Sequence, residues 1–111
     1  MKARIPNQGG QANMMKKLQQ MQDDMARVQK ECEEAQYSAS SGGGAVEVTV
    51  NGSHQLVSVK IQPDVVDPED VEMLEDLLVA SVNEAMRKAD ETLEREMGKI
   101  TGGMSIPGLG F

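Results

Sequence analysis

The segment DPEDVEMLEDLLVASVNEAMRKADETLEREMGKI, residues 67–100, is the longest part of the chain with an unbroken helical pattern. Asp67 suits the N-cap, Pro68 suits the first helical position, and the acidic residues that follow oppose the positive end of the helix dipole. Gly98, Gly102 and Gly103 offer places to end the helix. The segment therefore predicts one long helix from Asp67 to Ile100. Its apolar stripe follows the period of about 3.6 residues and contains Val71, Leu74, Leu78, Val82, Ala85, Ala89, Leu93, Met97 and Ile100.

A second apolar row widens this stripe in the first half of the segment and contains Met73, Leu77, Val79 and Met86. The first half is therefore expected to be buried on more than one side. The second half is rich in Glu, Arg and Lys and is expected to be a solvated arm with a narrow apolar seam.

The segment upstream of this helix has the alternation of a β-hairpin. Val46, Val48 and Val50 alternate with polar residues, and Val57, Val59 and Ile61 do the same. Between the two runs, Asn51-Gly52 supplies residues that tolerate positive φ. A loop of two or of four residues places both apolar rows on one face of the sheet, which can then lie on a helix. Pro63 ends the second strand.

Residues 36–44 connect the hairpin to the N-terminal part of the chain. Tyr37 and Ala39 alternate with polar residues, which indicates a short strand. The three glycines at 42–44 predict a turn or hinge. They are not interpreted as a phosphate-binding loop, because a strand and not a helix follows them.

A first helix is predicted from about Gln11. Its apolar residues are spaced alternately by four and three, which is a heptad pattern, and they are Met14, Leu18, Met21, Met25, Val28, Cys32 and Ala35. The seam requires a partner helix, either the second helix of the same chain or the first helix of another subunit. Cys32, the single cysteine, is expected to be a packed side chain and to fit a reducing compartment.

The composition predicts a small single domain. The chain has 111 residues with 9 Met and only two aromatic residues, Tyr37 and Phe111, so its core has few large rigid side chains. Such a chain gains stability by sharing a core with a second copy. Residues 1–12 are expected to be a disordered arm, 13–100 an α+β domain, and 101–111 a flexible tail. The apolar side chains of the tail either dock on a groove or stay mobile; they are Met104, Ile106, Leu109 and Phe111.

The charge is unevenly distributed along the chain. The formal net charge is −7, yet residues 1–30 hold six basic and two acidic residues, and the rest holds five basic and 16 acidic. A basic N-terminal part therefore precedes an acidic body. No apolar run approaches the roughly 18 residues that a membrane span needs, and no signal peptide is recognisable, so a cytoplasmic protein is expected.

Catalytic and metal-binding motifs are lacking in the sequence. His54, the single histidine, is interpreted as a loop residue, and the acidic residues around Asp67 as a capped helix start. The sequence thus predicts no enzyme, no cofactor, no metal site, no membrane partner and no small-molecule ligand.

The order of these segments resembles the YbaB/EbfC family of bacterial nucleoid-associated proteins over roughly residues 11–108. The similarity is carried by MKKLQQMQ (15–22), SSGGG (40–44), VTVNG (48–52) and EMLEDLLVASVNEA (72–85). The resemblance implies an α+β fold with a three-stranded antiparallel sheet between two long helices, in a two-fold homodimer whose helices project. It implies Tyr37–Ser41 as the first strand. It also implies binding of double-stranded DNA with broad specificity, a place in the nucleoid and an effect on gene expression.

The family has no compact motif that assigns DNA contacts residue by residue. The basic residues of the first helix and N-terminal arm are the first candidates for phosphate contacts, and those of the second helix come next. The candidates are Lys16, Lys17, Arg27, Lys30, Lys2 and Arg4, followed by Arg87, Lys88, Arg95 and Lys99. The alternative hypothesis is a dimeric helical adaptor or scaffold that acts on protein partners without binding DNA. Net acidity and the lack of stacking aromatics favour it.

Overall fold

The computed structural model describes residues 4–102, with side chains from Ala12 onward. The elements in chain order are helix α1 (Arg4–Glu34), strands β1 (Gln36–Ser41), β2 (Val46–Asn51) and β3 (Leu56–Ile61), a 3₁₀ turn η1 (Pro63–Val65) and helix α2 (Val71–Thr101). This is the predicted α+β fold, in which a three-stranded antiparallel sheet follows one long helix and precedes another along the chain. The predicted mobility of 101–111 and the docking of its apolar residues concern residues that lie almost wholly outside the described range. Of the arm 1–12 that was expected to be disordered, residues 1–3 lie outside this range and the rest is helical from Arg4 on.

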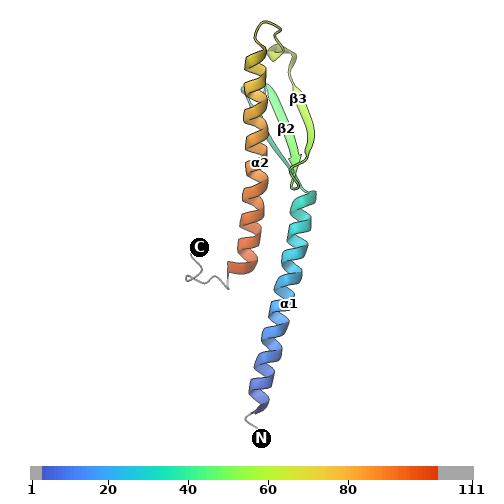
Figure 1. Ribbon diagram of the computed structural model, residues 1–111, viewed down its shortest axis with the longest axis vertical. Coiled ribbons are helices and arrows are strands. Elements are labelled where there is room, and N and C mark those ends of the chain that lie inside the picture. Colours follow the sequence, from blue (N-terminus) through green and yellow to red (C-terminus); the bar gives the residue numbers. More distant parts are fainter. Residues whose placement is uncertain (1–3, 103–111) are drawn as a thin grey trace.

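The molecule is elongated, and α1 forms much of its length (Figure 1). The radius of gyration is 22.3 Å, against roughly 13 Å for a compact domain of this size. Helix α1 begins at Arg4, earlier than the expected Gln11, and runs toward the sheet, while α2 runs back antiparallel to it. The N-terminal half of α1 extends past the end of α2 as an arm.

The sheet has the order β1-β2-β3, and α2 lies across β1 and β2. Its inner face carries Val46, Val48 and Val50, which are fully buried against α2. Helix α2 meets the sheet with small residues, since Ser81, Ala85 and Ala89 are its buried side chains. Their four-residue spacing keeps them on one side of the helix, so the two backbones can approach closely. The core is therefore built from valines on small residues.

The predicted hairpin is confirmed, with one change in register. Ile61 lies opposite Val46 and Val59 opposite Val48, so these residues share a face as expected. A β-bulge between Thr49 and Val50 makes Leu56, and not Val57, the partner of Val50. Val57, which was expected to share this face, is the extra residue of the bulge and has no partner in the ladder.

The predicted start of the second helix is also wrong. The Asp67 side chain accepts a hydrogen bond from the Glu69 amide at 2.9 Å and closes a turn. Asp70 is the N-cap, and its carboxylate accepts from the Met73 amide at 3.3 Å. Two aspartates three residues apart compete for the cap, and the one next to the apolar stripe prevails because the stripe is held by packing on the sheet.

The heptad seam of α1 is only partly covered. Val28 and Cys32 are buried where α1 packs on α2, whereas Met14 is 65% and Leu18 41% exposed. The partner helix over the second half of the seam is thus α2 of the same chain, and Cys32 is a packed, free thiol as expected. The first half of the seam belongs to the arm.

Candidate nucleic-acid interface

Helix α1 presents lysines whose ammonium groups have no carboxylate partner. Lys16, Lys17 and Lys30 lie on exposed turns of this helix, and no ion pair joins any of them to another described residue. When an unpaired lysine binds a phosphate, it releases counterions condensed on the DNA and gives up no ion pair of its own. These three are the candidates whose charge is fully available to a ligand.

Arg27 lies on the same helix but is engaged by its neighbours. Its guanidinium is 3.6 Å from Asp24 and 3.3 Å from Glu31, one helical turn away on either side. Such pairs contribute little to stability in water, yet they offset the charge of the arginine locally. Arg27 is therefore a weaker phosphate contact than the neighbouring lysines.

The basic candidates on α2 all contact other residues of the chain. Arg87 lies between Glu84 and Glu91 and bonds both. The Arg87 hydrogen bond is the main cause of the lowered pKa of Glu84, and the same contact raises the pKa of Arg87. Two glutamates around one arginine give this cluster a net negative charge, so it does not attract phosphate.

Toward the end of α2, one carboxylate serves two cations. Glu96 accepts from Lys99 at 3.0 Å and lies 3.8 Å from Arg95.

Lys88 instead donates to the backbone carbonyl of Ser38 at 2.8 Å. This bond ties α2 to β1, the first strand in the sheet order.

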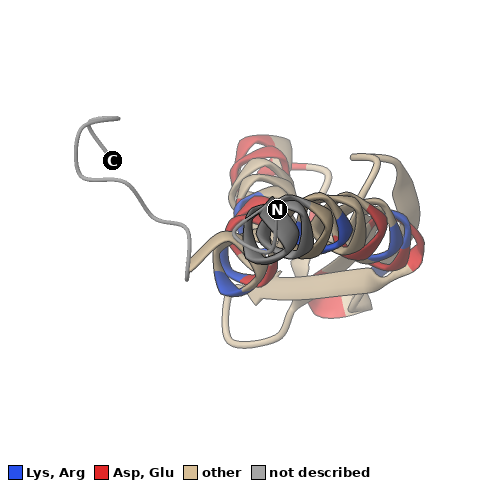
Figure 2. Cartoon of the chain, turned by 90° about the horizontal axis from the view of Figure 1, so that it is seen from below, with Lys and Arg blue, Asp and Glu red and all other residues tan. Residues whose placement is uncertain are grey.

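Lys17, a first candidate on α1, and Lys99, a second candidate on α2, line the same groove. This groove of about 410 Å³ between the two helices is lined by Lys17, Gln20, Met21, Asp24, Lys99 and Ile100. Seen from the arm end, basic segments occur on both helices and alternate with acidic ones (Figure 2). The structure thus joins Lys17 and Lys99 but leaves Arg87 and Lys88 farther along α2, beside the sheet. Lys2, and the side chain of Arg4, lie outside the described residues.

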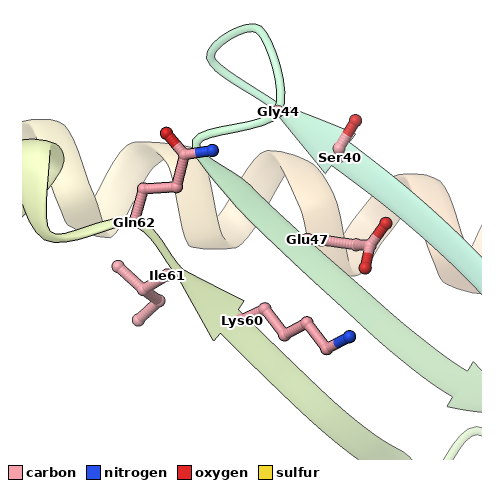
Figure 3. A pocket seen from close by; sticks show the side chains of 6 residues that line it. All are labelled: Ser40, Gly44, Glu47, Lys60, Ile61 and Gln62. Carbon is pink, nitrogen blue, oxygen red and sulfur yellow. The ribbon is translucent and has the colours of Figure 1, made fainter.

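One basic residue that the sequence did not single out lies on the outer face of the sheet. Ser40, Glu47 and Lys60 extend side by side from β1, β2 and β3 over a hollow of about 340 Å³, with α2 behind the sheet (Figure 3). Glu47 and Lys60 are cross-strand neighbours in the β2–β3 ladder. The hollow is open and lacks convergent buried polar groups, so we assign no ligand to it.

Other chemistry has little support among the described residues. Within residues 4–102, no three His, Cys, Asp or Glu side chains are arranged to hold a metal ion. His54 lies in the turn between β2 and β3, as expected, and contacts Asp90 of α2. Neither of the described helices is long and apolar enough to cross a membrane.

A long helix that projects from a small α+β body and carries unpaired lysines is typical of a protein that binds a polyanion through an arm. The sequence model of the YbaB/EbfC DNA-binding family matches residues 8–104. The chain belongs to this family, as its sequence motifs indicated.

Relatives of the chain carry the same description. It is 56% identical to a nucleoid-associated protein of Alkaliphilus metalliredigens, over 95% of each chain. It is 53% identical to one of Acetivibrio thermocellus, over 97% of each chain. The fold is similar to the crystal structure of an uncharacterized protein from Helicobacter pylori, with a TM-score of 0.58 and 24% identity over 70% of this chain and 90% of the other. A DNA-binding function in the nucleoid follows from the family and these close relatives.

Proposed function

We propose that this chain binds double-stranded DNA of the nucleoid as a homodimer, with broad specificity, through the projecting part of α1. The observation that carries the proposal is the set of unpaired lysines on that helix. Residues 63–76, around the start of α2, hold seven acidic residues and no basic one, and they lie at the opposite end of the molecule (Figure 1). A duplex can therefore approach the arm while the acidic end faces away, despite the net charge.

Broad specificity agrees with the kind of side chain on the arm. Lysine ammonium groups bind phosphates as point charges, and phosphate contacts position a protein on a duplex without reading its sequence. The described part of α1 has no aromatic side chain to insert between bases. Binding of this kind has modest affinity and a strong dependence on salt.

The homodimer is supported by an apolar face that the single chain leaves uncovered. Val59 and Ile61 continue the inner face of the sheet beyond α2 and remain 37% and 38% exposed, although their partners Val48 and Val46 are fully buried. Helix α2 also exposes apolar residues, Val71 among them at 53%. Contiguous apolar surface of this kind marks an interface, and β3 also has a free edge. A second copy of the chain can cover both.

The test is a fluorescence-anisotropy titration of a random duplex of about 30 base pairs, repeated over a range of salt concentrations, with the mass in solution measured by light scattering. The proposal predicts a mass of twice the chain's 12.0 kDa and an affinity that falls with salt, with a log–log slope of about −0.9 per phosphate contact. A monomer would contradict the dimer. Absence of binding even at low salt would contradict the DNA function and favour the adaptor hypothesis.

A further inference from the structure

The base of α1 is attached to the sheet through its own backbone. The Gly52 amide donates to the carbonyl of Glu33 at 3.1 Å, and the Tyr37 hydroxyl donates to the carbonyl of Cys32 at 3.1 Å. The last carbonyls of a helix have no partner within it, so here two successive ones are bonded by β1 and by the turn between β2 and β3. The C-terminal turn of α1 is thereby fixed to the body.

The contact at Gly52 leaves no room for a side chain. A Cβ atom on this residue would lie 1.9 Å from the carbonyl oxygen of Cys32 and 2.7 Å from Cα of Glu33. Both are backbone atoms, so they cannot turn aside as the end of a flexible side chain can. The positive φ of this turn is at His54, at 64°, and not at Gly52. Glycine is therefore required at position 52 by close approach to α1.

The same turn is also attached to α2. His54 Nε2 lies 2.6 Å from the carboxylate of Asp90. Within the turn, the Asn51 side chain accepts from the Ser53 amide at 2.9 Å and from the Gln55 amide at 3.0 Å, which holds the loop in one shape. The turn thus contacts both helices and has little freedom of its own.

We propose that the turn 51–55 is the joint that sets the direction of the α1 arm, with Gly52 as the positioning residue for DNA binding. This inference rests on the proposed function. Gly52 contacts α1 at a point about 7 Å along the helix axis from the packed Val28, at 1.5 Å per residue. Lys16 lies about 18 Å from Val28 in the opposite direction along the same axis. A shift of about 1–2 Å at the base, with Val28 as the pivot, therefore moves the arm lysines by about 3–5 Å.

Gly52→Ala tests the joint directly. Nitroxide labels are placed on Gln19→Cys in the arm and on either Asp76→Cys or Ser58→Cys in the body, in a Cys32→Ala background. Each labelled chain is diluted with unlabelled chain so that a dimer carries one labelled copy. At Gln19, about 13 Å from Val28, the same lever gives a displacement of about 2–4 Å, and we expect electron–electron resonance to show a change of about 2 Å or more in at least one mean distance. Gly98→Ala is the matched control, because a Cβ there meets nothing within 4 Å. Unchanged label-to-label distances in a folded Gly52→Ala variant would overturn the proposal that the turn sets the direction of the arm.

Tyr37→Phe provides a second variant that adds no atoms and removes one of the two bonds to α1. We expect broader distance distributions with little change in their means, because the base of the arm is held at one point fewer. If Gly52→Ala does not fold, this variant decides the inference, and unchanged widths would overturn it.

The link to function is read from the DNA titration of the same variants. Gly52→Ala is expected to lower the magnitude of the salt slope by about one per arm, as loss of one phosphate contact would. Gly98→Ala should bind like the parent chain. Distances that change while DNA binding stays the same would refute the role of the joint in binding. If the parent chain itself binds no DNA, the proposed function fails, and the distances still decide whether the turn sets the arm.

Discussion

Two double variants change the net charge by the same amount. Together they show whether DNA binding depends on where the cations lie or only on how many there are. Lys16→Ala/Lys17→Ala removes two unpaired charges from the arm, and Arg87→Ala/Arg95→Ala removes two that are paired with carboxylates. Each pair of substitutions makes the formal net charge of −7 more negative by two. Any difference in DNA binding between them then reflects where the charges lie.

The expected magnitude follows from counterion release. Each phosphate contact contributes about 0.9 to the log–log salt slope, so loss of both lysine contacts lowers the slope by about 1.8 for one engaged arm. At about 0.1 M salt the same relation gives a loss of about 60-fold in affinity. For the arginine variant we expect a change in slope near zero and only a small loss of affinity, because Glu84, Glu91 and Glu96 already offset these charges.

The assay is the anisotropy titration of one duplex at several salt concentrations, with helix content measured by circular dichroism for each variant. All four positions are exposed, so both variants should fold like the parent chain. Equal losses of affinity in the two variants would refute the reasoning, because they would show that net charge and not the unpaired arm lysines governs binding.

Three further predictions concern the dimer, the core and Tyr37. Val59→Asp should give a monomer in sedimentation experiments, since it places a charge on the uncovered apolar face, and a persistent dimer would place the interface elsewhere. Val48→Ala should lower the free energy of unfolding by about 2–3 kcal/mol in urea titrations because Val48 is fully buried, whereas Val66→Ala, at a 55% exposed position, should change it by less than about 0.5 kcal/mol. Burial, and then the neighbouring Cys32, raise the pKa of Tyr37 above its ordinary value. The protonated hydroxyl therefore stabilises the fold below about pH 10, and this contribution is lost as the pH rises through the folded-state pKa. Because Tyr37 is the only tyrosine, its tyrosinate absorbance should titrate higher in the folded chain than in urea, and an identical midpoint would contradict the contact.

Much of the fold was predictable because strong periodic patterns agree with the packing. The alternation at Val46, Val48 and Val50 and the helical period after Val71 both describe one buried face, and burial of that face decides the structure. The short strand around Tyr37 and Ala39 was recognised by the same alternation. These elements depend on local patterns that the chain repeats several times.

The misplaced details depend on contacts between distant residues. Asn51-Gly52 indicated a turn with positive φ, but Gly52 is needed because α1 lies against it, and the sequence of the turn holds no sign of α1. The bulge at Val50 and the cap at Asp70 likewise follow from how the strands and α2 fit together. A pattern within one segment cannot predict such fits.

The sequence predicts a location for the DNA contacts, and the structure adds which of the candidate cations are paired. The excess of basic residues before residue 31 predicts DNA contacts on the first helix. Which cations are paired depends on side-chain positions one helical turn away, as for Arg27, or across the fold, as for Lys88. The DNA contacts themselves stay predictions until they are measured.

The most direct measurement is a map of backbone amide chemical shifts by NMR as a short duplex is added to the isotopically labelled chain. Binding through the arm predicts that the largest changes cluster on α1 around Lys16 and Lys17, while residues 63–76 at the acidic end change little. Changes concentrated on the sheet or on the first half of α2, with α1 unaffected, would contradict the claim that the α1 arm binds DNA.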